Sequence, residues 1–364
     1  MKPLIAVALS GGVDSMVAAA LLKSKNSDVI GIHFRTGFEK KPSDLKNLPD
    51  APLESRLKAA AEALHIPLTF VDISERFRAD VVRYFLLEYQ NGRTPNPCMV
   101  CNRHIKFGEL LDRARELGAK YLATGHYARL AQGTLGRFQL LRGIDPNKDQ
   151  SYFLALLTQD QLKSACFPLG GYTKEDVKSM AKRFGMTPLV EDESQETCFI
   201  EGNDYPRFLA KEGIHGNPGP IVDRTGKALG THQGLFAYTI GQRRGIGIPA
   251  AEPYYVIRID TEKNQLVVGH KSELYSAECE VEGINWIALP PDGPIKVNTR
   301  IRYRHKEAPS TLIPMDNNKA LVRFNSPQEA VTPGQGAVFY QGEKVIGGGW
   351  IKGNRSSHRK DAKE

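Results

Sequence analysis

Ser10-Gly11-Gly12-Val13-Asp14-Ser15 is the stretch that decides the first half of the fold. It follows the apolar run Leu4–Leu9 and precedes the apolar run Met16–Leu22, an order that predicts a strand, a glycine turn and a helix. Two glycines let the backbone approach a ligand closely, and the start of a helix offers unpaired N–H groups with a partial positive charge. The stretch therefore predicts a phosphate site.

The loop differs from two familiar phosphate loops. It lacks the Gly-Lys-Ser/Thr ending of a Walker A loop and the G-x-G-x-x-G spacing of a dinucleotide fingerprint. Two glycines alone would indicate only a tight turn. Six residues of this kind between a strand and a helix favour phosphate binding over that alternative.

The composition is that of an ordinary globular protein. The 364 residues predict two to three domains, and 41% hydrophobic with 25% charged residues is typical of such chains. No apolar run approaches the ~18 residues of a membrane span, and Met1-Lys2-Pro3 leads directly into the first expected strand, without a signal peptide. Five cysteines, an odd count, argue against a secreted disulfide framework. We therefore expect a cytoplasmic protein with no membrane partner.

The charge gives a first indication of the partner. A net charge of +8 and an isoelectric point near 9.1 favour a polyanion such as a nucleic acid. A merely basic enzyme would have the same charge, so composition alone leaves both alternatives open.

Apolar strands and helical patterns alternate through the first part of the chain, which predicts an α/β domain over residues 1–200. The expected strands are Leu4–Leu9, Val29–Phe34, Leu68–Ile73 and Tyr121–Thr124. The expected helices are Met16–Lys25, Leu53–Leu64, Arg76–Gln90, Phe107–Leu117, Gln159–Lys163 and Lys174–Phe184. Such alternation predicts a doubly wound parallel sheet with its ligand at the carboxyl ends of the strands. The proline-containing stretch 37–52 is expected to be a mobile loop.

The pattern changes near residue 200. Residues 201–275 are rich in glycine, with short apolar stretches between turns, and predict a small, mostly β central linker domain. Residues 276–353 predict a C-terminal antiparallel β-barrel. Its expected strands include Cys279–Trp286, Val297–His305, Lys319–Phe324 and Gly336–Gln341. Residues 354–364 lack large apolar side chains and are expected to form a disordered basic tail.

Cys98-Met99-Val100-Cys101 is the second informative motif. Two prolines precede it, so we expect it to begin in a loop. A Cys-x-x-Cys pair in a reducing compartment indicates redox chemistry or half of a metal site, but a zinc site needs four ligands and the chain has no second such pair. Cys198 lies far away in the sequence. Cys166 and Cys279 have apolar neighbours and are expected to be structural thiols.

Further motifs follow these two in order. They are Thr124-Gly125-His126-Tyr127-Ala128, Lys148-Asp149-Gln150-Ser151-Tyr152-Phe153-Leu154, Ser194-Gln195-Glu196-Thr197-Cys198-Phe199, Gly241-Gln242-Arg243-Arg244-Gly245 and Arg302-Tyr303-Arg304. Together the motifs resemble those of the tRNA-specific 2-thiouridylases, a family of PP-loop (pyrophosphate-loop) N-type ATP pyrophosphatases. The resemblance runs from about residue 4 to about residue 352. It implies that residues 1–200 form a PP-loop ATP pyrophosphatase catalytic domain whose sheet is of the adenine nucleotide α-hydrolase type. It also implies that the central linker domain, residues 201–275, binds tRNA.

The resemblance implies ATP-dependent 2-thiolation of the wobble uridine in tRNA, expected for lysine, glutamate and glutamine acceptors. ATP would convert the C2 oxygen into an adenylate, with release of pyrophosphate and then of AMP. Cys198 would carry the sulfur as a persulfide and Cys101 would act as the nucleophile, leaving a Cys101–Cys198 disulfide. The implied partners are tRNA and a sulfur donor, either a cysteine desulfurase or a sulfur-relay protein.

The resemblance also assigns binding residues. ATP would be bound by Ala8, Leu9, Ser10, Gly11, Gly12, Val13, Asp14, Ser15, Phe34 and Gly125. Asp14 is the candidate Mg²⁺ ligand, because carboxylate oxygens suit this ion. Phe34 would lie against adenine, with a core aromatic as the alternative, and Gly125 would let the nucleotide approach the fourth strand.

The tRNA would be bound by a second set of residues. These are Asn96, Pro97, Cys98, His126, Lys148, Asp149, Gln150, Arg243, Arg244, Arg302, Tyr303 and Gln335. For His126 the alternative is a buried core histidine. A base flipped out of the anticodon loop is expected, because C2 is hard to reach in a stacked loop.

One basic stretch indicates RNA binding without any family. In Arg300-Ile301-Arg302-Tyr303-Arg304-His305-Lys306, a period of two predicts that the three arginines and Lys306 share one face of a strand. Four cations on one face form a track for phosphates, with an ordinary solvated face as the alternative.

Cys98 departs from the family pattern, in which many members carry Asp at this position. As a third thiol beside Cys101 and Cys198, it raises the alternative that the three cysteines hold a [4Fe–4S] cluster whose open iron binds sulfide. Two more remote alternatives remain. Another AMP-forming PP-loop ligase would leave the cysteines unexplained, and an RNA-binding protein with a degenerate ATP fold would not need an intact SGGVDS loop.

Overall fold

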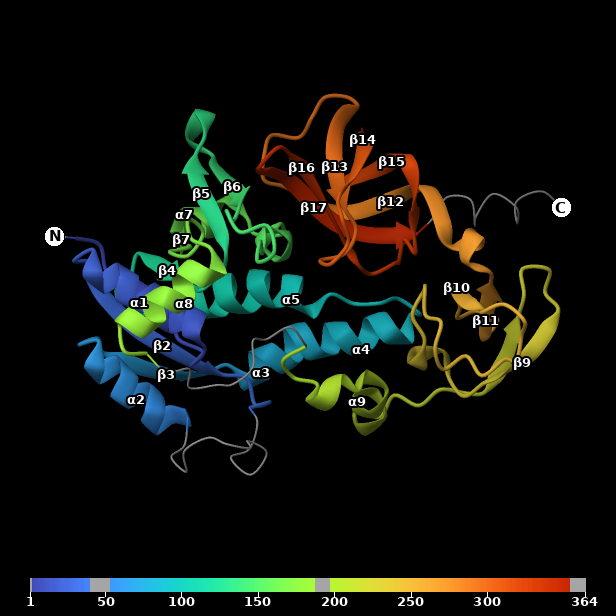
Figure 1. The fold of residues 1–364 in the computed structure, drawn as a ribbon, viewed down its shortest axis with the longest axis horizontal. Helices are drawn as coiled ribbons and strands as arrows, with labels where there is room; N and C mark the ends of the chain where they lie inside the picture. Colours follow the sequence, from blue (N-terminus) through green and yellow to red (C-terminus); the bar gives the residue numbers. More distant parts are fainter. Residues whose placement is uncertain (1, 40–52, 187–196, 354–364) are drawn as a thin grey trace. The chain divides into compact units, whose positions relative to one another are not determined.

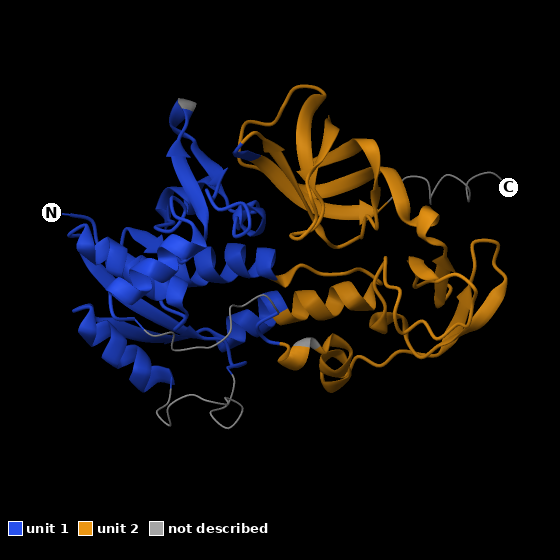
Figure 2. Ribbon diagram, viewed as in Figure 1, with its two compact units in different colours: residues 1–81, 98–199, 343–345 blue, residues 82–97, 200–342, 346–364 orange. Residues whose placement is uncertain are grey.

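The computed structural model describes residues 2–39, 53–186 and 197–353 (Figure 1). The chain divides into two compact units (Figure 2). Unit 1 consists of residues 1–81, 98–199 and 343–345, and unit 2 of residues 82–97, 200–342 and 346–364. The expected tail 354–364 and most of the expected loop 37–52 lie outside the described residues. None of the described helices is both long and apolar enough to cross a membrane.

Unit 1 is built on a five-stranded parallel sheet with the strand order β3-β2-β1-β4-β7. The strands are β1 (Ile5–Ala8), β2 (Val29–Arg35), β3 (Leu68–Asp72), β4 (Tyr121–Ala123) and β7 (Ala165–Cys166). The central strand β1 pairs in parallel with β2 on one side and with β4 on the other. The chain thus leaves β1 on one side and returns on the other, which creates a switch point at the carboxyl ends of β1 and β4. The predicted doubly wound parallel sheet is confirmed, and β7 is an additional strand.

Helices cover this sheet, and α1 packs on two sides. The helical segments of unit 1 include α1 (Val13–Ser24), α2 (Leu53–Ala63), α3 (Ser74–Phe77), the π-helical η2 (Arg78–Val82), α5 (Pro97–Val100), the π-helical η3 (Cys101–Glu109), α6 (Leu110–Glu116), α7 (Gln159–Ser164) and α8 (Lys174–Arg183). Met16 of α1 joins an apolar cluster with Val7 of β1. Val17, one residue on, packs with Val177 of α8, which lies beside α1 (Figure 1). The alanine-rich sequence of α1 lets both neighbours approach closely.

The cysteine motif lies in a helix rather than a loop. Helical residues run from Pro97 to Glu116 through α5, η3 and α6, whereas the sequence predicted a helix only from Phe107. That prediction was wrong because a proline at the first helical position costs nothing: the N–H that it lacks would have no partner there. Cys98 and Cys101 therefore belong to the first turns of a helix.

A hairpin and a small sheet complete the two units. Strands β5 (Ala128–Gln132) and β6 (Phe138–Arg142) form an antiparallel hairpin in unit 1 that the sequence did not predict. Unit 2 contains α4 (Arg83–Gln90), α9 (Tyr205–Lys211) and a four-stranded sheet of order β10-β11-β8-β9. Its strands are β8 (Gly219–Val222), β9 (Ala228–His232), β10 (Tyr255–Asp260) and β11 (Gln265–Gly269). Ile221, Val256 and Leu266 form the core of this sheet.

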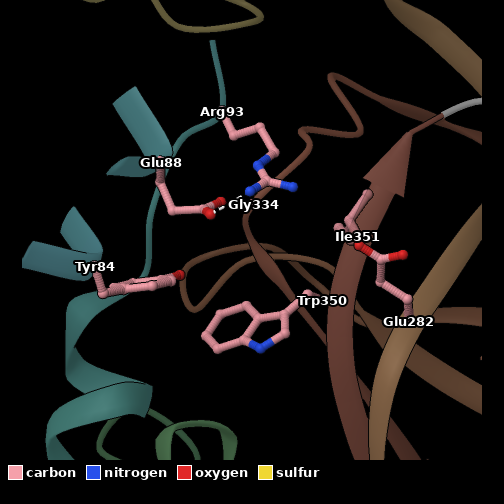
Figure 3. A pocket seen from close by; sticks show the side chains of 7 residues that line it. All are labelled: Tyr84, Glu88, Arg93, Glu282, Gly334, Trp350 and Ile351. Atoms are coloured by element: carbon pink, nitrogen blue, oxygen red, sulfur yellow. Dashed lines mark hydrogen bonds and ion pairs between the residues drawn. The ribbon is translucent and has the colours of Figure 1, made fainter. Parts of the chain in front are cut away.

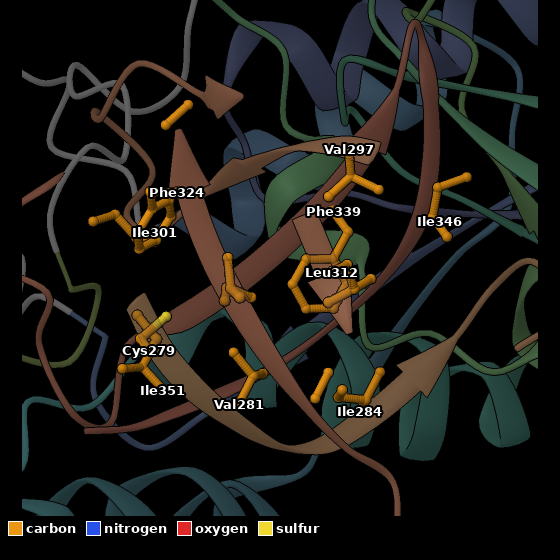
Figure 4. Close-up of a cluster of buried hydrophobic side chains, with 14 residues drawn as sticks. Cys279, Val281, Ile284, Val297, Ile301, Leu312, Phe324, Phe339, Ile346 and Ile351 are labelled. Carbon is orange, nitrogen blue, oxygen red and sulfur yellow. The ribbon is translucent and has the colours of Figure 1, made fainter. Parts of the chain in front are cut away.

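The C-terminal part of unit 2 is the predicted antiparallel barrel. Its strands are β12 (Tyr275–Trp286), β13 (Ile295–Arg300), β14 (Ala308–Met315), β15 (Lys319–Glu329), β16 (Gly336–Gln341) and β17 (Lys344–Gly353). They follow the order β12-β15-β14-β13-β16-β17, and β12 pairs with β17 to close the ring. Alternate residues such as Val281, Leu312 and Phe339 point inward and fill the barrel (Figure 4). Cys279 is fully buried in the same core, as expected of a structural thiol.

Candidate active site

The SGGVDS loop joins β1 to α1 in a closed turn. Gly11 has a φ of +85°, a conformation that favours glycine, and helix α1 begins directly after Gly12. The Ser10 N–H donates to Ser15 Oγ over 3.2 Å, and the Ser15 hydroxyl donates to the Gly12 carbonyl over 2.9 Å. Ser10 is exposed, whereas Ser15 is buried. The turn is therefore fixed by its own side chains, with its outer residues open to solvent at the switch point.

Gly125 lies against this loop at the end of β4. A Cβ atom at this position would lie 2.9 Å from the carbonyl carbon of Asp14 and 3.0 Å from the nitrogen of Ser15. Both are backbone atoms that cannot rotate aside. The contact between the end of β4 and the loop is therefore enough to explain why residue 125 is a glycine. The expected close approach of a nucleotide to Gly125 stays a prediction.

Asp14 is paired with a buried lysine. Lys174 Nζ, at the start of α8, lies 2.8 Å from Asp14 Oδ1 and 3.0 Å from Oδ2, and the Tyr127 hydroxyl donates to Oδ1 over 2.8 Å. Both carboxylate oxygens are therefore engaged, and a Mg²⁺ ion on them would face the Lys174 ammonium. In this arrangement Lys174 neutralises Asp14, and the role of Asp14 as a Mg²⁺ ligand stays a prediction.

Sequence reasoning missed Lys174. The signal was its place directly after Thr173, which caps α8 in a capping box with Asp176. A lysine that is only 8% exposed at a helix start, where the helix dipole disfavours a cation, needs a specific partner.

Three thiols form the second part of the site. Cys98 and Cys198 are exposed, Cys101 is half-buried, and ionisation of Cys198 would raise the pKa of both other thiols. The fold thus brings together segments that lie about 100 residues apart in the sequence. The described residues include all five cysteines, and all five are free thiols, so the predicted Cys101–Cys198 disulfide is not formed in this structure.

The protein around the thiols shifts their titration. The surrounding protein atoms exclude most water from these thiols, which raises the pKa of Cys98 to about 11 and that of Cys101 to about 12. Part of the Cys98 side chain is nevertheless exposed to solvent. The pKa of Cys198 is also raised, chiefly by the same cause. Lys106 opposes the shift at all three thiols. This lysine, five residues after Cys101, was not singled out from the sequence.

The thiols do not form a metal-ligand set as they stand. Among the described residues, which include the three cysteines, no three Cys, His, Asp or Glu side chains are gathered around one point that could hold a metal ion. The three thiols are therefore not arranged as cluster ligands in this structure, and the [4Fe–4S] alternative stays a prediction.

The structure gives several expected tRNA-binding side chains internal partners. His126 is 8% exposed, accepts or donates a 2.7 Å hydrogen bond with Thr124 and packs edge-on against Phe167. Burial, and then the charge of Lys106, lower its pKa well below the usual value. These contacts favour the core-histidine alternative.

The segment Lys148–Gln150 is also largely internal. The Asp149 carboxylate is buried and accepts hydrogen bonds from the N–H groups of Gly143 and Ser151. The Gln150 side chain accepts from the Tyr127 N–H over 3.0 Å. Lys148 is half-buried. The side chains of Asp149 and Gln150 therefore hold the local backbone in place. To contact tRNA as expected, each would have to form a further hydrogen bond in addition to these internal ones.

Gln335 and Asn96 stabilise a loop of unit 2. The Gln335 amide donates to the carbonyls of Thr94 and Pro95 over 3.0 and 2.9 Å. Asn96 is 7% exposed, and its N–H donates to the Tyr84 hydroxyl over 3.3 Å. Pro97 is buried as well. These residues shape the chain just before Cys98.

The predicted cation track on one strand is wrong. β13 ends at Arg300, and residues 301–305 form a turn, so the period of two does not extend through Arg304 and Lys306. Arg302 donates to the carbonyls of Ile240 and Ala330 inside unit 2, which is a structural role. The Arg300 guanidinium lies 5.1 Å from the centre of the half-buried Tyr303 ring.

Other predicted residues remain open to a ligand. Arg243 and Arg244 are exposed in the turn that follows Gly241. Phe34, the penultimate residue of β2, is half-buried. Its neighbour His33 is buried, and its Nδ1 forms a 2.7 Å hydrogen bond with the Leu9 carbonyl beside the SGGVDS loop.

Unit 2 contains a pocket of about 230 Å³ (Figure 3). It is lined by Tyr84, Glu88, Arg93, Glu282, Gly334, Trp350 and Ile351. Arg93 donates to Glu88 over 2.6 Å, and the rings of Tyr84 and Trp350 face each other with centres 5.6 Å apart. Burial raises the pKa of Glu88, and Arg93 opposes that shift. The lining includes no thiol and no residue of the SGGVDS loop.

Comparisons with known proteins cover nearly the whole chain. A family model described as tRNA methyl transferase HUP domain matches residues 3–202. A model described as tRNA methyl transferase PRC-barrel domain matches residues 207–270, and one described as aminomethyltransferase beta-barrel domain matches residues 276–351. A "tRNA-specific 2-thiouridylase MnmA" from Geotalea uraniireducens is 46% identical over 96% of this chain and 94% of its own length. A protein of the same name from Geobacter metallireducens is 47% identical over 95% of this chain and 96% of its own length. Another from Desulfosudis oleivorans is 47% identical over 96% of this chain and 95% of its own length.

Proposed function

Because the chain belongs to the family of tRNA-specific 2-thiouridylases, we propose that it is an ATP-dependent tRNA-uridine 2-sulfurtransferase. The observation that supports this most directly is that one compact unit holds both the SGGVDS loop and the three thiols Cys98, Cys101 and Cys198. A phosphate loop alone would fit any AMP-forming ligase. Thiols from two distant segments are needed only if sulfur is transferred.

The first step activates the uridine. The C2 oxygen attacks the α-phosphorus of ATP, a P–O bond forms, and pyrophosphate leaves with the electron pair of the bond that breaks. The resulting adenylate turns a poor leaving group into AMP, a good one. In this proposal the backbone N–H groups of the loop and the Ser10 hydroxyl bind the phosphates at the start of α1. Lys174 keeps the Asp14 carboxylate neutralised next to them.

The second step transfers sulfur. The terminal sulfur of a Cys198 persulfide, as an anion, attacks C2; a C–S bond forms and the C–O bond to AMP breaks. The Cys101 thiolate then attacks the Cys198 sulfur, so the S–S bond breaks and its electron pair stays on the sulfur bound to uridine. The products are 2-thiouridine and a Cys101–Cys198 disulfide, which an external thiol must reduce before the next turnover.

The polyanionic partner in this proposal is tRNA, with the wobble uridine of lysine, glutamate and glutamine acceptors as the target. The exposed Arg243 and Arg244 would bind backbone phosphates. Asn96 and Cys98, which shortly precede Cys101 in the sequence, would border the flipped base. A desulfurase or a sulfur-relay protein would load Cys198, whose exposure makes it accessible to a donor.

A reaction with purified components tests the proposal. The protein is incubated with ATP, a persulfide donor and unmodified tRNA, and the products are AMP and 2-thiouridine. AMP without thiolation would favour another PP-loop ligase, and neither product would favour a non-enzymatic RNA-binding protein.

The cluster alternative has its own test. Protein prepared anaerobically is assayed for iron and acid-labile sulfide. Because the three thiols are not gathered as metal ligands, we expect full activity in preparations that contain iron far below one equivalent per chain. Activity that rises in proportion to bound iron would contradict the persulfide mechanism.

A further inference from the structure

The helix that carries Cys101 changes its hydrogen-bond pattern at that residue. From Cys101 to Glu109 it is a π-helix, and the Leu110 N–H at its end bonds to the carbonyl of Ile105, five residues back. In an α-helix of 3.6 residues per turn, Lys106 would lie about 140° around the axis from Cys101. The wider π turn brings the fifth residue much closer to the face of the first. π segments are rare and are frequent at functional sites.

Gln161 holds this segment from outside. Its amide nitrogen donates to the carbonyls of Arg103 and Phe107 over 2.7 and 2.9 Å. Its amide oxygen accepts from the Thr158 N–H over 3.0 Å, within the capping box that starts α7. One side chain thus joins the start of α7 to two carbonyls of η3. A second bond, from the Asn102 amide to the Phe153 carbonyl, holds the same turn at 3.3 Å.

The side chain placed by this turn is a cation near three thiols. Lys106 is half-buried, and it lies in unit 1 together with the three thiols. Its positive charge lowers the pKa of Cys98, Cys101 and Cys198, against the effect of burial. It also acts on His126, which burial keeps neutral, so that this imidazole adds no second cation. Glu39 acts on Cys198 in the opposite sense. Among the described residues, Lys106 is therefore a positive charge that acts on all three thiols.

We propose that Lys106 is a positioning residue of the sulfur-transfer site, whose ammonium stabilises the thiolate and persulfide anions of Cys101 and Cys198, and that the π turn held by Gln161 puts it there. The proposal rests on the proposed function for its role in catalysis. The charge effect itself exists without tRNA and can be measured alone. In water-poor surroundings a shared cation lowers the free energy of each sulfur anion in turn.

Thiol alkylation as a function of pH tests the charge effect. Lys106→Met, Lys106→Arg and the control Lys178→Met, on the exposed face of α8, are treated with iodoacetamide, and each cysteine is quantified by mass spectrometry. We expect Lys106→Met to alkylate Cys101 and Cys198 about three- to tenfold more slowly at pH 8, with profiles displaced to higher pH, because a tenfold change corresponds to one pKa unit. Lys106→Arg and Lys178→Met should follow the wild type. Unchanged profiles in Lys106→Met would overturn the proposal.

Gln161→Leu tests the role of the π turn. It keeps the side chain's size and removes both carbonyl contacts, so we expect a displacement of the Cys101 profile in the same direction. A wild-type profile would show that Gln161 does not position Lys106.

Single-turnover thiolation of tRNA separates the two proposals. A displaced alkylation profile with no thiolation by the wild type would support the charge effect and contradict the proposed function. Thiolation lost in Lys106→Met with an unchanged alkylation profile would support the function and overturn the role of Lys106 as a charge on the thiols. If Lys106→Met slows both thiol alkylation and tRNA thiolation, and Lys106→Arg restores both rates, the charge effect and the proposed function are both supported.

Discussion

Lys174 Nζ lies 2.8 Å from Asp14 Oδ1, and this pair joins residues 160 positions apart in the sequence. The lysine begins α8 and the aspartate lies in the first turn of α1. Helix α8 packs on α1 through Val177, and its first residue also neutralises the negative charge of Asp14 in the phosphate loop. A carboxylate so close to the proposed phosphate site would repel ATP if it were not neutralised.

Lys174→Met tests this relationship. The variant leaves the partly buried Asp14 carboxylate with only the Tyr127 hydroxyl among the contacts described above, which we expect to lower the free energy of unfolding by about 1–3 kcal/mol. Pyrophosphate release should fall more than tenfold, because the loop then carries a net negative charge. Denaturant unfolding and a pyrophosphate assay measure the two effects.

Lys178→Met, which loses only an exposed pair with Glu175, is the matched control and should behave as the wild type. Undiminished pyrophosphate release in Lys174→Met would refute the idea that the ion pair serves ATP binding.

Gly125→Ala tests the contact between β4 and the loop. The new methyl group would lie about 3 Å from backbone atoms of Asp14 and Ser15, as given above, and one of the two segments must move. We expect a loss of about 1–3 kcal/mol in stability and a lower rate of AMP formation. Gly171→Ala is the control, because a Cβ there meets nothing within 4 Å. Equal stability of the two variants would mean that the loop can shift freely.

His126 predicts a pH dependence of stability. Burial lowers its pKa well below 6.5 in the folded protein, so below that pH the unfolded chain binds more protons. Stability should therefore fall as the pH drops below about 6.5, by up to ~1.4 kcal/mol per pH unit from this residue.

The comparison with His126→Asn isolates this contribution. The variant should lose that part of the slope and retain wild-type affinity for tRNA. A large loss of tRNA affinity with an unchanged slope would instead make His126 a tRNA contact.

Arg243 and Arg244 predict a salt dependence. If both bind phosphates, the double variant to alanine should weaken tRNA binding and reduce the slope of log K against log salt by about 0.7 per lost contact, or about 1.4 in total. Arg224→Ala, which removes an exposed arginine paired with Glu273, should leave the slope unchanged. Equal slopes for wild type and double variant would exclude these two arginines from the tRNA interface.

The parts of the fold that follow local rules were predictable. The SGGVDS turn, the parallel strands around it and the C-terminal barrel depend on apolar periodicity and on glycine, which act within a few residues. The two errors arose where a local rule was extended too far. Pro97, directly before Cys98, begins a helix where a proline predicts a loop, and the alternation of residues after Arg300 continues in the sequence beyond the point where β13 ends.

The missing parts of the site depend on long-range contacts. Neither the partner of Asp14 nor the cation near Cys198 has a sequence signal close to the residue that it serves. Lys106 shares the thiol site because of a π turn, and α-helical periodicity would have placed it elsewhere. Asp149, Gln150 and Gln335 occur in family motifs, yet their side chains bond within the protein. A motif marks where such residues are needed without indicating whether they touch the substrate.

The central claim is that Cys198 carries the sulfur to a uridine that the SGGVDS loop has activated. Single-turnover reactions of Cys198→Ser with ATP, a persulfide donor and unmodified tRNA measure this most directly, with Cys166→Ala as the control thiol. We predict that Cys198→Ser releases pyrophosphate at close to the wild-type rate and forms no 2-thiouridine, while Cys166→Ala forms both products. Thiolation by Cys198→Ser at the wild-type rate would contradict the account.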